Sequence, residues 1–461
     1  MTKRLLSLSL LAIAQTTFYF FPILSEAQKI ACGGQHSVFI CRDSSVNAWG
    51  ANSFGQLGST VGFSSTPISV NLISHVTNVG GGVNHTVALK DDSTVWAWGS
   101  NITGELGNGT NTGSSIPIRV TGLSGIKEIS CMYHTLALKS DSTVFAWGYN
   151  DYGELGNGLS GGSSNVPVPV AGGLTGVTHI ACGYYHSLAI KRDSTVAAWG
   201  ASPGNGINTV SNVPISIPGL RDVIAIAAGN GFSLALKKDS TVWAWGGNNE
   251  GELGNASSAI SYSPVQVIGL TKVVAIAAGV YHALALKDDG TIWAWGFNLN
   301  GQLGNGSNTD SHVAIPVPGL SGITAIAAGY AHTFAMKNDS TGWAWGANNY
   351  GQLGNASFVN SPIPVQVSGL CAHLISVNEI GDPASISVFP NPSTGKFTIS
   401  SADFISSGLV EIFNLNGTLI HTQKIFLSSS FTVDVKAVSA GIYFMKLLDV
   451  NKYYWKKILV E

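Results

Sequence analysis

The sequence predicts an all-β chain in which a seven-bladed β-propeller is followed by a small antiparallel β-sandwich domain. Two observations support the propeller. The dipeptide Trp-Gly recurs seven times, at intervals of 49, 49, 52, 46, 50 and 50 residues. A histidine, or in the fifth unit a phenylalanine, stands thirteen residues before each of these tryptophans. The tryptophans are Trp49, Trp98, Trp147, Trp199, Trp245, Trp295 and Trp345, and the residues before them are His36, His85, His134, His186, Phe232, His282 and His332.

Each repeated unit contains about four short β-rich runs. In the unit of His282, residues 284–287 and 291–295 are separated by the turn at 288–290, which is the pattern of two strands joined by a tight turn. A third run, residues 273–279, precedes the histidine, and a fourth apolar run follows each glycine-rich loop. A single unit leaves two apolar faces uncovered, whereas seven units packed around an axis bury these faces against one another.

The loops after the Trp-Gly pairs share the pattern Asn-x-x-Gly-Gln/Glu-Leu-Gly. This pattern is found at residues 52–58, 101–107, 150–156, 298–304 and 348–354. Together with Gly-x-x-His-Ser/Thr and Trp-Gly in fixed order, it resembles regulator of chromosome condensation repeats. The resemblance covers residues 29 to about 376 and implies a propeller of residues 28–376. The fourth unit lacks the loop pattern and the fifth has Phe232 in place of the histidine, so we expect these two blades to be the most altered.

The first 27 residues are typical of a secretory signal peptide. A basic start is followed by an apolar run over residues 5–24 and a small-x-small site at residues 25–27. The mature chain is therefore expected outside the cytoplasm. From Gln28 to Ser376 there are 14 Lys plus Arg and 17 Asp plus Glu, a net charge of −3. This composition supplies no basic surface for nucleic acid, so the chromatin and small-GTPase partners of the eukaryotic namesake are not expected.

The five cysteines divide into two groups. Cys32, Cys131 and Cys182 occupy a position that holds alanine in other units, so we expect them to be buried small residues. Cys41 and Cys371 stand near the two ends of the repeat region. We expect residues 29–41 to share a closing blade with residues 362–376, and the two cysteines would then approach each other. Spacing alone does not establish a disulfide between them.

A second domain follows a polar linker at residues 377–385. Its alternating runs between residues 386 and 461 predict a small antiparallel β-sandwich. The segments Phe389-Pro-Asn-Pro-Ser-Thr-Gly395, Ala440-Gly-Ile-Tyr443 and the closing 456–461 resemble the C-terminal sorting domain of the type IX secretion system of the Bacteroidota. The resemblance implies export across both membranes, with the mature protein released or attached to the cell surface. An ordinary accessory sandwich domain is the alternative.

None of the recurring polar residues predicts a metal, cofactor or catalytic site. Equivalent histidines of successive blades are spread around a ring, too far apart to share one ion, so we interpret them as structural. The lysines that precede the Asp-containing turns are explained by local solvation of those turns. Glutamate and glutamine interchange in the loop pattern, which favours a hydrogen-bonding role over acid or base catalysis.

Five tyrosines stand in the variable turns just before the repeat histidines and form our candidate binding surface. Tyrosine favours interfaces because it buries a large area and keeps a polar tip. We therefore expect an extracellular module that binds a protein or a glycan on one rim, although the same rings would also serve to cover the mouth of the central channel. The alternative function is a polysaccharide hydrolase or lyase that uses Asp151, Glu154 or Glu250. The five tyrosines are Tyr133, Tyr184, Tyr185, Tyr281 and Tyr330.

Overall fold

The structure is a computed structural model. It describes residues 29–371, apart from 203, 205 and 207, and residues 386–460, apart from 392, 415–418, 436–437 and 450–451. The chain divides into two compact units, residues 1–371 and 372–461. The predicted signal peptide and the predicted linker at 377–385 lie outside the described residues.

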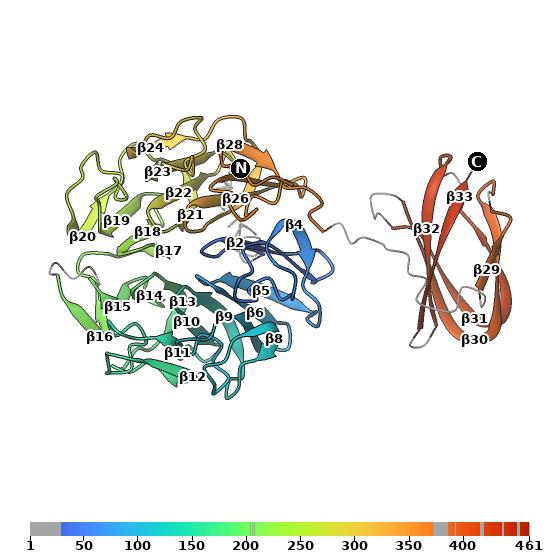
Figure 1. Cartoon of the computed structure of the whole chain (residues 1–461), viewed down its shortest axis with the longest axis horizontal. Coiled ribbons are helices and arrows are strands. Elements are labelled where there is room, and N and C mark those ends of the chain that lie inside the picture. Colours follow the sequence, from blue (N-terminus) through green and yellow to red (C-terminus); the bar gives the residue numbers. More distant parts are fainter. Residues whose placement is uncertain are drawn as a thin grey trace, which may run out of the picture. The chain divides into compact units, whose positions relative to one another are not determined.

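The first unit consists of seven four-stranded antiparallel sheets arranged around an axis, which confirms the predicted seven-bladed propeller (Figure 1). Each sheet is built from four consecutive strands, so we number the blades one to seven in chain order. The blades are β1–β4 (Ile30–Cys32, His36–Ile40, Val46–Gly50, Ser64–Ser69), β5–β8 (Val76–Gly81, His85–Lys90, Val95–Gly99, Ser114–Arg119), β9–β12 (Ile126–Cys131, His134–Lys139, Val144–Tyr149, Ser163–Pro169), β13–β16 (Val177–Cys182, His186–Lys191, Val196–Ala201, Val210–Ser216), β17–β20 (Val223–Ala228, Phe232–Lys237, Val242–Gly246, Ser261–Gln266), β21–β24 (Val273–Ala278, His282–Lys287, Ile292–Gly296, Ser311–Pro316) and β25–β28 (Ile323–Ala328, His332–Lys337, Gly342–Gly346, Ser361–Gln366).

The register of the second and third strands explains the thirteen-residue spacing. In blade six, His282 pairs with Gly296 across the hairpin, and Ala283 pairs with Trp295. The histidine and the Trp-Gly pair therefore meet at the same end of two antiparallel strands. Because the turn between those strands has a constant length, the spacing is constant as well.

The prediction of a shared closing blade is wrong. Blade one already contains its own inner strand, β1, in which Ile30 pairs with Phe39 of β2. Blade seven is likewise complete, because Trp343 of β27 pairs with Gln366 of β28. Neither end of the repeat region lacks a strand that the other end must supply, so the ring closes by packing one whole blade against another.

Three kinds of contact hold the two end blades together. Trp49 and Phe334 pack edge to face, with ring centroids 5.4 Å apart. The indole of Trp49 donates a hydrogen bond of 2.9 Å to the backbone carbonyl of Gln352. Cys41 and Cys371 form a disulfide, with a Cα–Cα distance of 5.7 Å. The cysteine pair therefore clasps adjacent ends of the ring although the two ends do not share a sheet.

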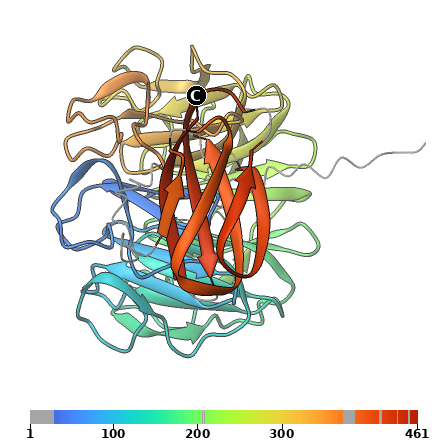
Figure 2. The ribbon, with the colours of Figure 1, turned by 90° about the vertical axis from the view of Figure 1, so that its right-hand side faces the viewer.

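The second unit is a five-stranded antiparallel β domain. Its strands are β29 (Ile386–Phe389), β30 (Lys396–Asn414), β31 (Leu419–Asp434), β32 (Gly441–Asp449) and β33 (Lys452–Val460). The order is β29-β30-β32-β33, and β31 also pairs with β30. Figure 2 shows these strands, coloured orange to red, from a second direction. The long strand β30 pairs with both β31 and β32, and its residues Phe397, Ile399, Val410 and Ile412 belong to a core of its own. This core explains why the domain's strands alternate apolar and polar residues.

Candidate functional site

A repeated hydrogen-bond relay connects successive blades of the propeller. Nε2 of His36 lies 2.9 Å from the hydroxyl oxygen of Thr86 in the next blade. That hydroxyl donates to the backbone carbonyl of Gln56, at 2.8 Å, and the indole of Trp98 donates to the same carbonyl, at 2.9 Å. One carbonyl of the Gln/Glu-Leu-Gly loop thus accepts two donors from the next blade. The sequence elements of the repeat are therefore parts of one interblade contact.

The contacts of this relay recur at other blade interfaces, and the bond from the hydroxyl to the loop carbonyl is also made by Ser37, Ser187 and Thr333. The histidine and hydroxyl pairs are His36–Thr86, His85–Thr135, His134–Ser187, His186–Ser233, His282–Thr333 and His332–Ser37. The indole donors and carbonyl acceptors are Trp49–Gln352, Trp98–Gln56, Trp147–Glu105, Trp199–Glu154, Trp295–Glu252 and Trp345–Gln302. The seven tryptophans of the Trp-Gly pairs and the six histidines that precede them by thirteen residues are all buried.

The two irregular units alter this relay in different ways. In the fifth unit Phe232 replaces the histidine, and the residue that would receive its hydrogen bond is Ala283, the one position of its kind without a hydroxyl. In the fourth unit the Gln/Glu-Leu-Gly loop is missing, and the buried Nε1 of Trp245 has no hydrogen-bond partner among the described residues. The first alteration replaces both members of a polar pair, whereas the second leaves a donor without an acceptor among the residues described here.

The buried histidines are neutral in the folded protein. Burial lowers the pKa of His36, His134 and His282 to about 3, and that of His85, His186 and His332 to about 4. The described part of the chain contains no group of three His, Cys, Asp or Glu side chains that could hold a metal ion. The histidines lie in different blades, and each forms a hydrogen bond with a hydroxyl of the next blade. These bonds connect successive blades.

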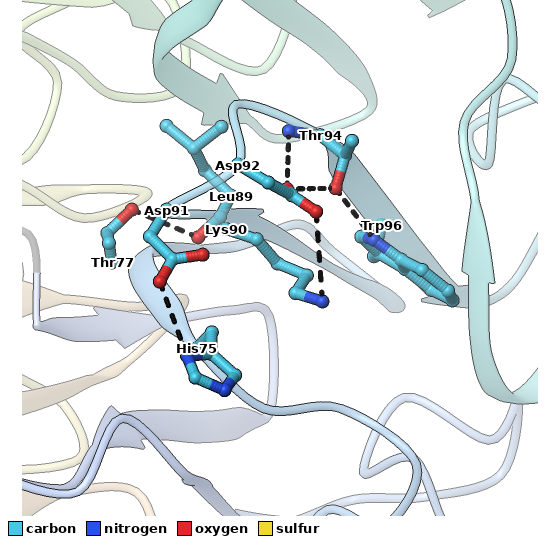
Figure 3. Close-up of polar contacts among 8 residues, drawn as sticks. All are labelled: His75, Thr77, Leu89, Lys90, Asp91, Asp92, Thr94 and Trp96. Carbon is cyan, nitrogen blue, oxygen red and sulfur yellow. Dashed lines mark hydrogen bonds and ion pairs between the residues drawn. The ribbon is translucent and has the colours of Figure 1, made fainter.

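The lysines form local contacts with their own turns. Figure 3 shows the turn of blade two, in which Lys90 lies 4.0 Å from Asp92, and Asp92 accepts hydrogen bonds from the backbone and hydroxyl of Thr94. The Thr94 hydroxyl accepts a bond of 3.1 Å from the indole of Trp96, and Nζ of Lys90 lies 5.6 Å from the centroid of that ring. Lys90 therefore lies between an acidic turn and an aromatic ring, and Lys237 and Lys287 lie over their own indoles in the same way.

The five candidate tyrosines meet in one contacting group, which we call the tyrosine cluster. They come from the turns between the first and second strands of blades three, four, six and seven. Tyr184 lies at its centre, with its ring centroid 5.0 Å from Tyr133, 6.0 Å from Tyr185 and 6.5 Å from Tyr330. Tyr281 joins through Tyr330, at 6.4 Å. Residues about 50 to 200 positions apart in the chain therefore form one surface.

Backbone hydrogen bonds between successive turns support the tyrosine cluster. Tyr184 N–H donates to the carbonyl of Gly229, and Tyr330 N–H donates to the carbonyl of Gly34 in the first blade. The Asn230 side chain also donates a bond of 2.8 Å to the hydroxyl of Tyr281. The turns that carry the rings are thus fixed by the closed ring of blades.

The members of the tyrosine cluster differ in exposure. Tyr184 is 4% exposed, and its hydroxyl has no hydrogen-bond partner in the part of the chain that the structure describes. Tyr330 is 44% exposed, and Tyr133, Tyr185 and Tyr281 are half-buried. Burial raises the pKa of Tyr184 above its ordinary value, and the neighbouring tyrosines add to this effect. Tyr184 therefore serves as a packed centre from which the other four rings extend toward solvent.

Sequence reasoning missed three aromatic residues that extend the tyrosine cluster. Tyr149 lies 5.8 Å from Tyr133, Tyr152 lies 5.3 Å from Tyr185, and Phe297 lies 6.2 Å from Tyr281. They stand at the ends of third strands or in the loops that follow them. In an antiparallel hairpin the end of the third strand returns to the rim that carries the tyrosine turns. The predicted pairing of the second and third strands could therefore have identified these three residues.

A cavity of about 240 Å³, lined mainly by small and aliphatic residues, lies along the axis. It is lined by residues from the first strand of all seven blades, so it belongs to the central channel. Met132, in the turn just before Tyr133, also lines it. Cys32, Cys131 and Cys182 are free thiols on its wall, and burial raises the pKa of Cys32 and Cys182 to about 12. These thiols are therefore protonated packing residues.

The three acidic residues of the alternative function do not form one site. Glu154 is buried, and its carboxylate accepts a bond of 2.9 Å from the backbone of Tyr152, as Gln56 does from Phe54 in blade one. Burial raises the pKa of Glu154 to about 7, and Asp151 nearby adds to this. Glu250 stands in blade five, where partial burial and a hydrogen bond with Asp310 raise its pKa. Among the described contacts, none joins Glu250 to Asp151 or Glu154.

Comparison with protein families finds two matches. The regulator of chromosome condensation (RCC1) repeat matches residues 43–89, 92–138, 141–190, 239–286, 289–336 and 342–377. A second model of the same repeat also matches 177–206 and 223–252, which include parts of the two irregular units. The secretion system C-terminal sorting domain matches residues 387–461.

Similar solved structures share the propeller fold. Human WBSCR16 is 24% identical, covers 71% of this chain and 94% of its own, and has a TM-score of 0.63. Prp20p from Saccharomyces cerevisiae is 21% identical, covers 76% of this chain and 89% of its own, and has a TM-score of 0.64. At these identities the likeness shows the fold alone.

A curated relative matches only a short part of the chain. The ulvan lyase NLR42 of Nonlabens ulvanivorans is 40% identical over 79 residues, which is 17% of this chain and 15% of that protein. Such a stretch is about the length of one small domain and does not span the propeller.

No helix among the described residues is long and apolar enough to cross a membrane.

The repeat matches cover more than half of the chain and agree with the seven sheets of the propeller. The sorting-domain match assigns the second unit to export through the type IX secretion machinery, so the protein is secreted or displayed at the cell surface. The chain belongs to the regulator of chromosome condensation (RCC1) repeat family and carries a secretion system C-terminal sorting domain.

Proposed function

We propose that the propeller is an extracellular binding module that holds a protein or a glycan on the rim formed by the tyrosine cluster. The observation that carries this proposal is that tyrosines from four different blades gather into one group of rings, most of which remain partly exposed. Tyrosine rings supply a large contact area and lose little conformational freedom when they bind.

Position within the cluster indicates which tyrosines would contact a ligand. The ring of Tyr184 is buried and packs at the centre of the cluster. The exposed parts of Tyr133, Tyr185, Tyr281 and Tyr330 lie beyond this ring and are available to a partner. Tyr152, which is 42% exposed and contacts Tyr185, extends the surface toward the loop of blade three.

The test is a binding comparison between two matched variants. In the first, Tyr133, Tyr185, Tyr281 and Tyr330 are changed to serine and Tyr184 is kept, so that the packed centre remains. In the control, Leu72 and Ile268 are changed to serine, because these exposed apolar residues stand in connections between blades at the opposite rim. Binding to a glycan array and to proteins of the host's surroundings should be lost in the first variant and kept in the control. Equal binding by both variants would refute the proposed surface.

A second candidate, cleavage of a polysaccharide, has one specific observation in its favour. Glu154 has a pKa near neutrality, and it stands beside Asp151, whose pKa is lowered chiefly by a backbone hydrogen bond from Gly162. A protonated and an ionised carboxyl group are the pair that acid and base catalysis requires. The short match to a protein named as an ulvan lyase does not carry that activity to this chain.

The chain itself offers a conservative test of this candidate. Glutamine occupies the Glu154 position in three other units, as Gln56, Gln302 and Gln352, and accepts the same backbone hydrogen bond. Glu154→Gln should therefore fold normally while removing the titrating group. Turnover of a glycan panel by the parent and none by this variant would support the enzyme, whereas no turnover by the parent leaves the binding module as the function.

A further inference from the structure

A pocket of about 370 Å³ opens at the rim opposite to the tyrosine cluster, next to blade four. Its wall is formed by the connection at residues 172–176, by Lys191, Arg192 and Asp193 in the turn after β14, and by Ala197 with residues 214–216 of the two outer strands. Residues 172–176 belong to the connection at 171–176, which contains Gly172 and Gly173 and is one residue longer than the equivalent connection at 121–125 of the preceding blade. This pocket is distinct from the central channel.

The pocket coincides with a missing aromatic side chain. Ala197 stands two residues before Trp199, at the position held by tryptophan in four other blades and by phenylalanine in blade three. Those residues are Trp96, Phe145, Trp243, Trp293 and Trp343. Ala197 keeps the same strand register, since it pairs with Ser216 as Trp243 pairs with Gln266. The backbone is therefore regular, and only the ring is absent.

The surroundings of the missing ring are retained. In three of those blades a lysine lies over the indole, with distances to the ring centroid of 5.6 Å for Lys90, 5.5 Å for Lys237 and 5.2 Å for Lys287. Lys191 is the equivalent lysine and lines the pocket. Thr195 is equivalent to Thr94, whose hydroxyl accepts the indole N–H of Trp96. An aromatic ring placed in the pocket would thus find the cation of Lys191, and the position of Thr195 in the strand is also retained.

The charges of the pocket favour an anion beside that ring. Lys191 is balanced by Asp193, with 3.7 Å between Nζ and the carboxylate. The side chain of Arg192 also lines the pocket, and it makes no ion pair with a described residue. One positive charge therefore remains uncompensated by the side chains that line the pocket.

We propose that this pocket binds a small aromatic compound that carries one anionic group. The aromatic ring takes the place that a tryptophan side chain fills in four other blades, under Lys191, and the anion pairs with Arg192. The occupant is a separate small molecule because the strand geometry of blade four is complete without it.

The test uses two probes that differ only in charge and a variant that restores the missing ring. Binding of indole-3-acetate and indole-3-acetamide to the full chain is measured by isothermal titration calorimetry and by ligand-observed NMR. Both probes should bind, and the acetate should bind up to about five-fold more tightly, as expected for one solvent-screened ion pair. Ala197→Trp should abolish binding of both probes, because the side chain fills the pocket.

Two further variants keep the outcome decisive. Arg192→Ala should bring the affinities of the two probes to the same value while the neutral probe still binds. If Ala197→Trp does not fold, Ala197→Phe replaces it, since blade three accommodates Phe145 at this position. Absence of binding by either probe at millimolar concentration, or equal binding by the parent and the ring-restoring variant, would overturn the proposal. A preference for the acetate that survives in Arg192→Ala would overturn the assignment of the anion to Arg192.

Discussion

Replacing a histidine and its hydroxyl partner in one step of the relay should cost less than the sum of the separate replacements. The fifth unit provides the template, because Phe232 and Ala283 stand where the other units have a histidine and a hydroxyl. His282 and Thr333 connect blades six and seven, with 3.0 Å between Nε2 and Oγ1. The variants are His282→Phe, Thr333→Ala and the double replacement. Gly279 leaves room for the ring, because a Cβ there would lie 2.3 Å from Cε1 of His282.

The expected magnitudes follow from the groups left unpaired. Thr333→Ala leaves Nε2 of His282 buried without a partner, and it also removes the hydroxyl that donates to Gln302, at 3.0 Å. We expect a loss of about 1–3 kcal/mol in the free energy of unfolding. His282→Phe leaves the Thr333 hydroxyl its bond to Gln302 and should cost about 0.5–1.5 kcal/mol. The double variant leaves neither group unpaired, so a coupling energy of about 1–2 kcal/mol is expected.

The pH dependence gives an independent measurement of the same contact. Burial lowers the pKa of His282 to about 3, while the unfolded chain has the ordinary value of about 6.5. Below pH 6.5 the unfolded state therefore binds a proton that the folded state does not, so stability is present above this pH and is lost as pH falls toward 3. Between pH 7.5 and 5 one such histidine accounts for about 2 kcal/mol.

Denaturant titrations of the four proteins at pH 7.5 and 5, followed by tryptophan fluorescence, measure both effects. His282→Phe should lose less stability on acidification than the parent by the contribution of one histidine. Strict additivity of the two single replacements, or an unchanged pH dependence in His282→Phe, would refute the relay as a source of stability. Ala283→Thr serves as the control, because it adds a hydroxyl beside Phe232, where no histidine is present to donate a hydrogen bond to it.

Three further predictions concern the ring and the second unit. Cys371→Ser should fold but unfold at a lower denaturant concentration, because the disulfide to Cys41 closes a loop of 330 residues. For such a loop, chain entropy gives an upper limit of about 5–6 kcal/mol for the stabilisation. The parent under reducing conditions should match this variant, and an unchanged unfolding midpoint would contradict a stabilising role of the disulfide. Trp147→Ala should lower the free energy of unfolding by about 3–5 kcal/mol, since the ring is fully buried between blades, and a midpoint equal to that of the parent would contradict this packing. A chain that lacks the domain from residue 386 onward should contain a propeller of normal thermal stability that stays in the periplasm of the native host, and its appearance in the medium would exclude the sorting role.

The sequence by itself determined the number of blades, the position of most strands and the route of export. These features depend on local rules. A hairpin such as that of His282 and Gly296 is set by residues within fifteen positions of each other, and it repeats with the Trp-Gly spacing. The sorting domain was likewise recognisable from short segments in a fixed order. Because one local pattern is repeated seven times, the fold class could be predicted without any knowledge of distant contacts.

Only the tertiary structure decided how the ring closes and which side chains meet. Sequence reasoning placed the two ends of the repeat region in one blade, whereas each end completes its own sheet, and a disulfide with packed rings joins them. The contact of Tyr184 with Tyr330 and the pocket left by Ala197 depend on rim turns and strands from separate blades. Such contacts join residues up to several hundred positions apart, and their distances follow from the curvature of the whole ring. Short sequence patterns within one blade do not predict the curvature of the ring.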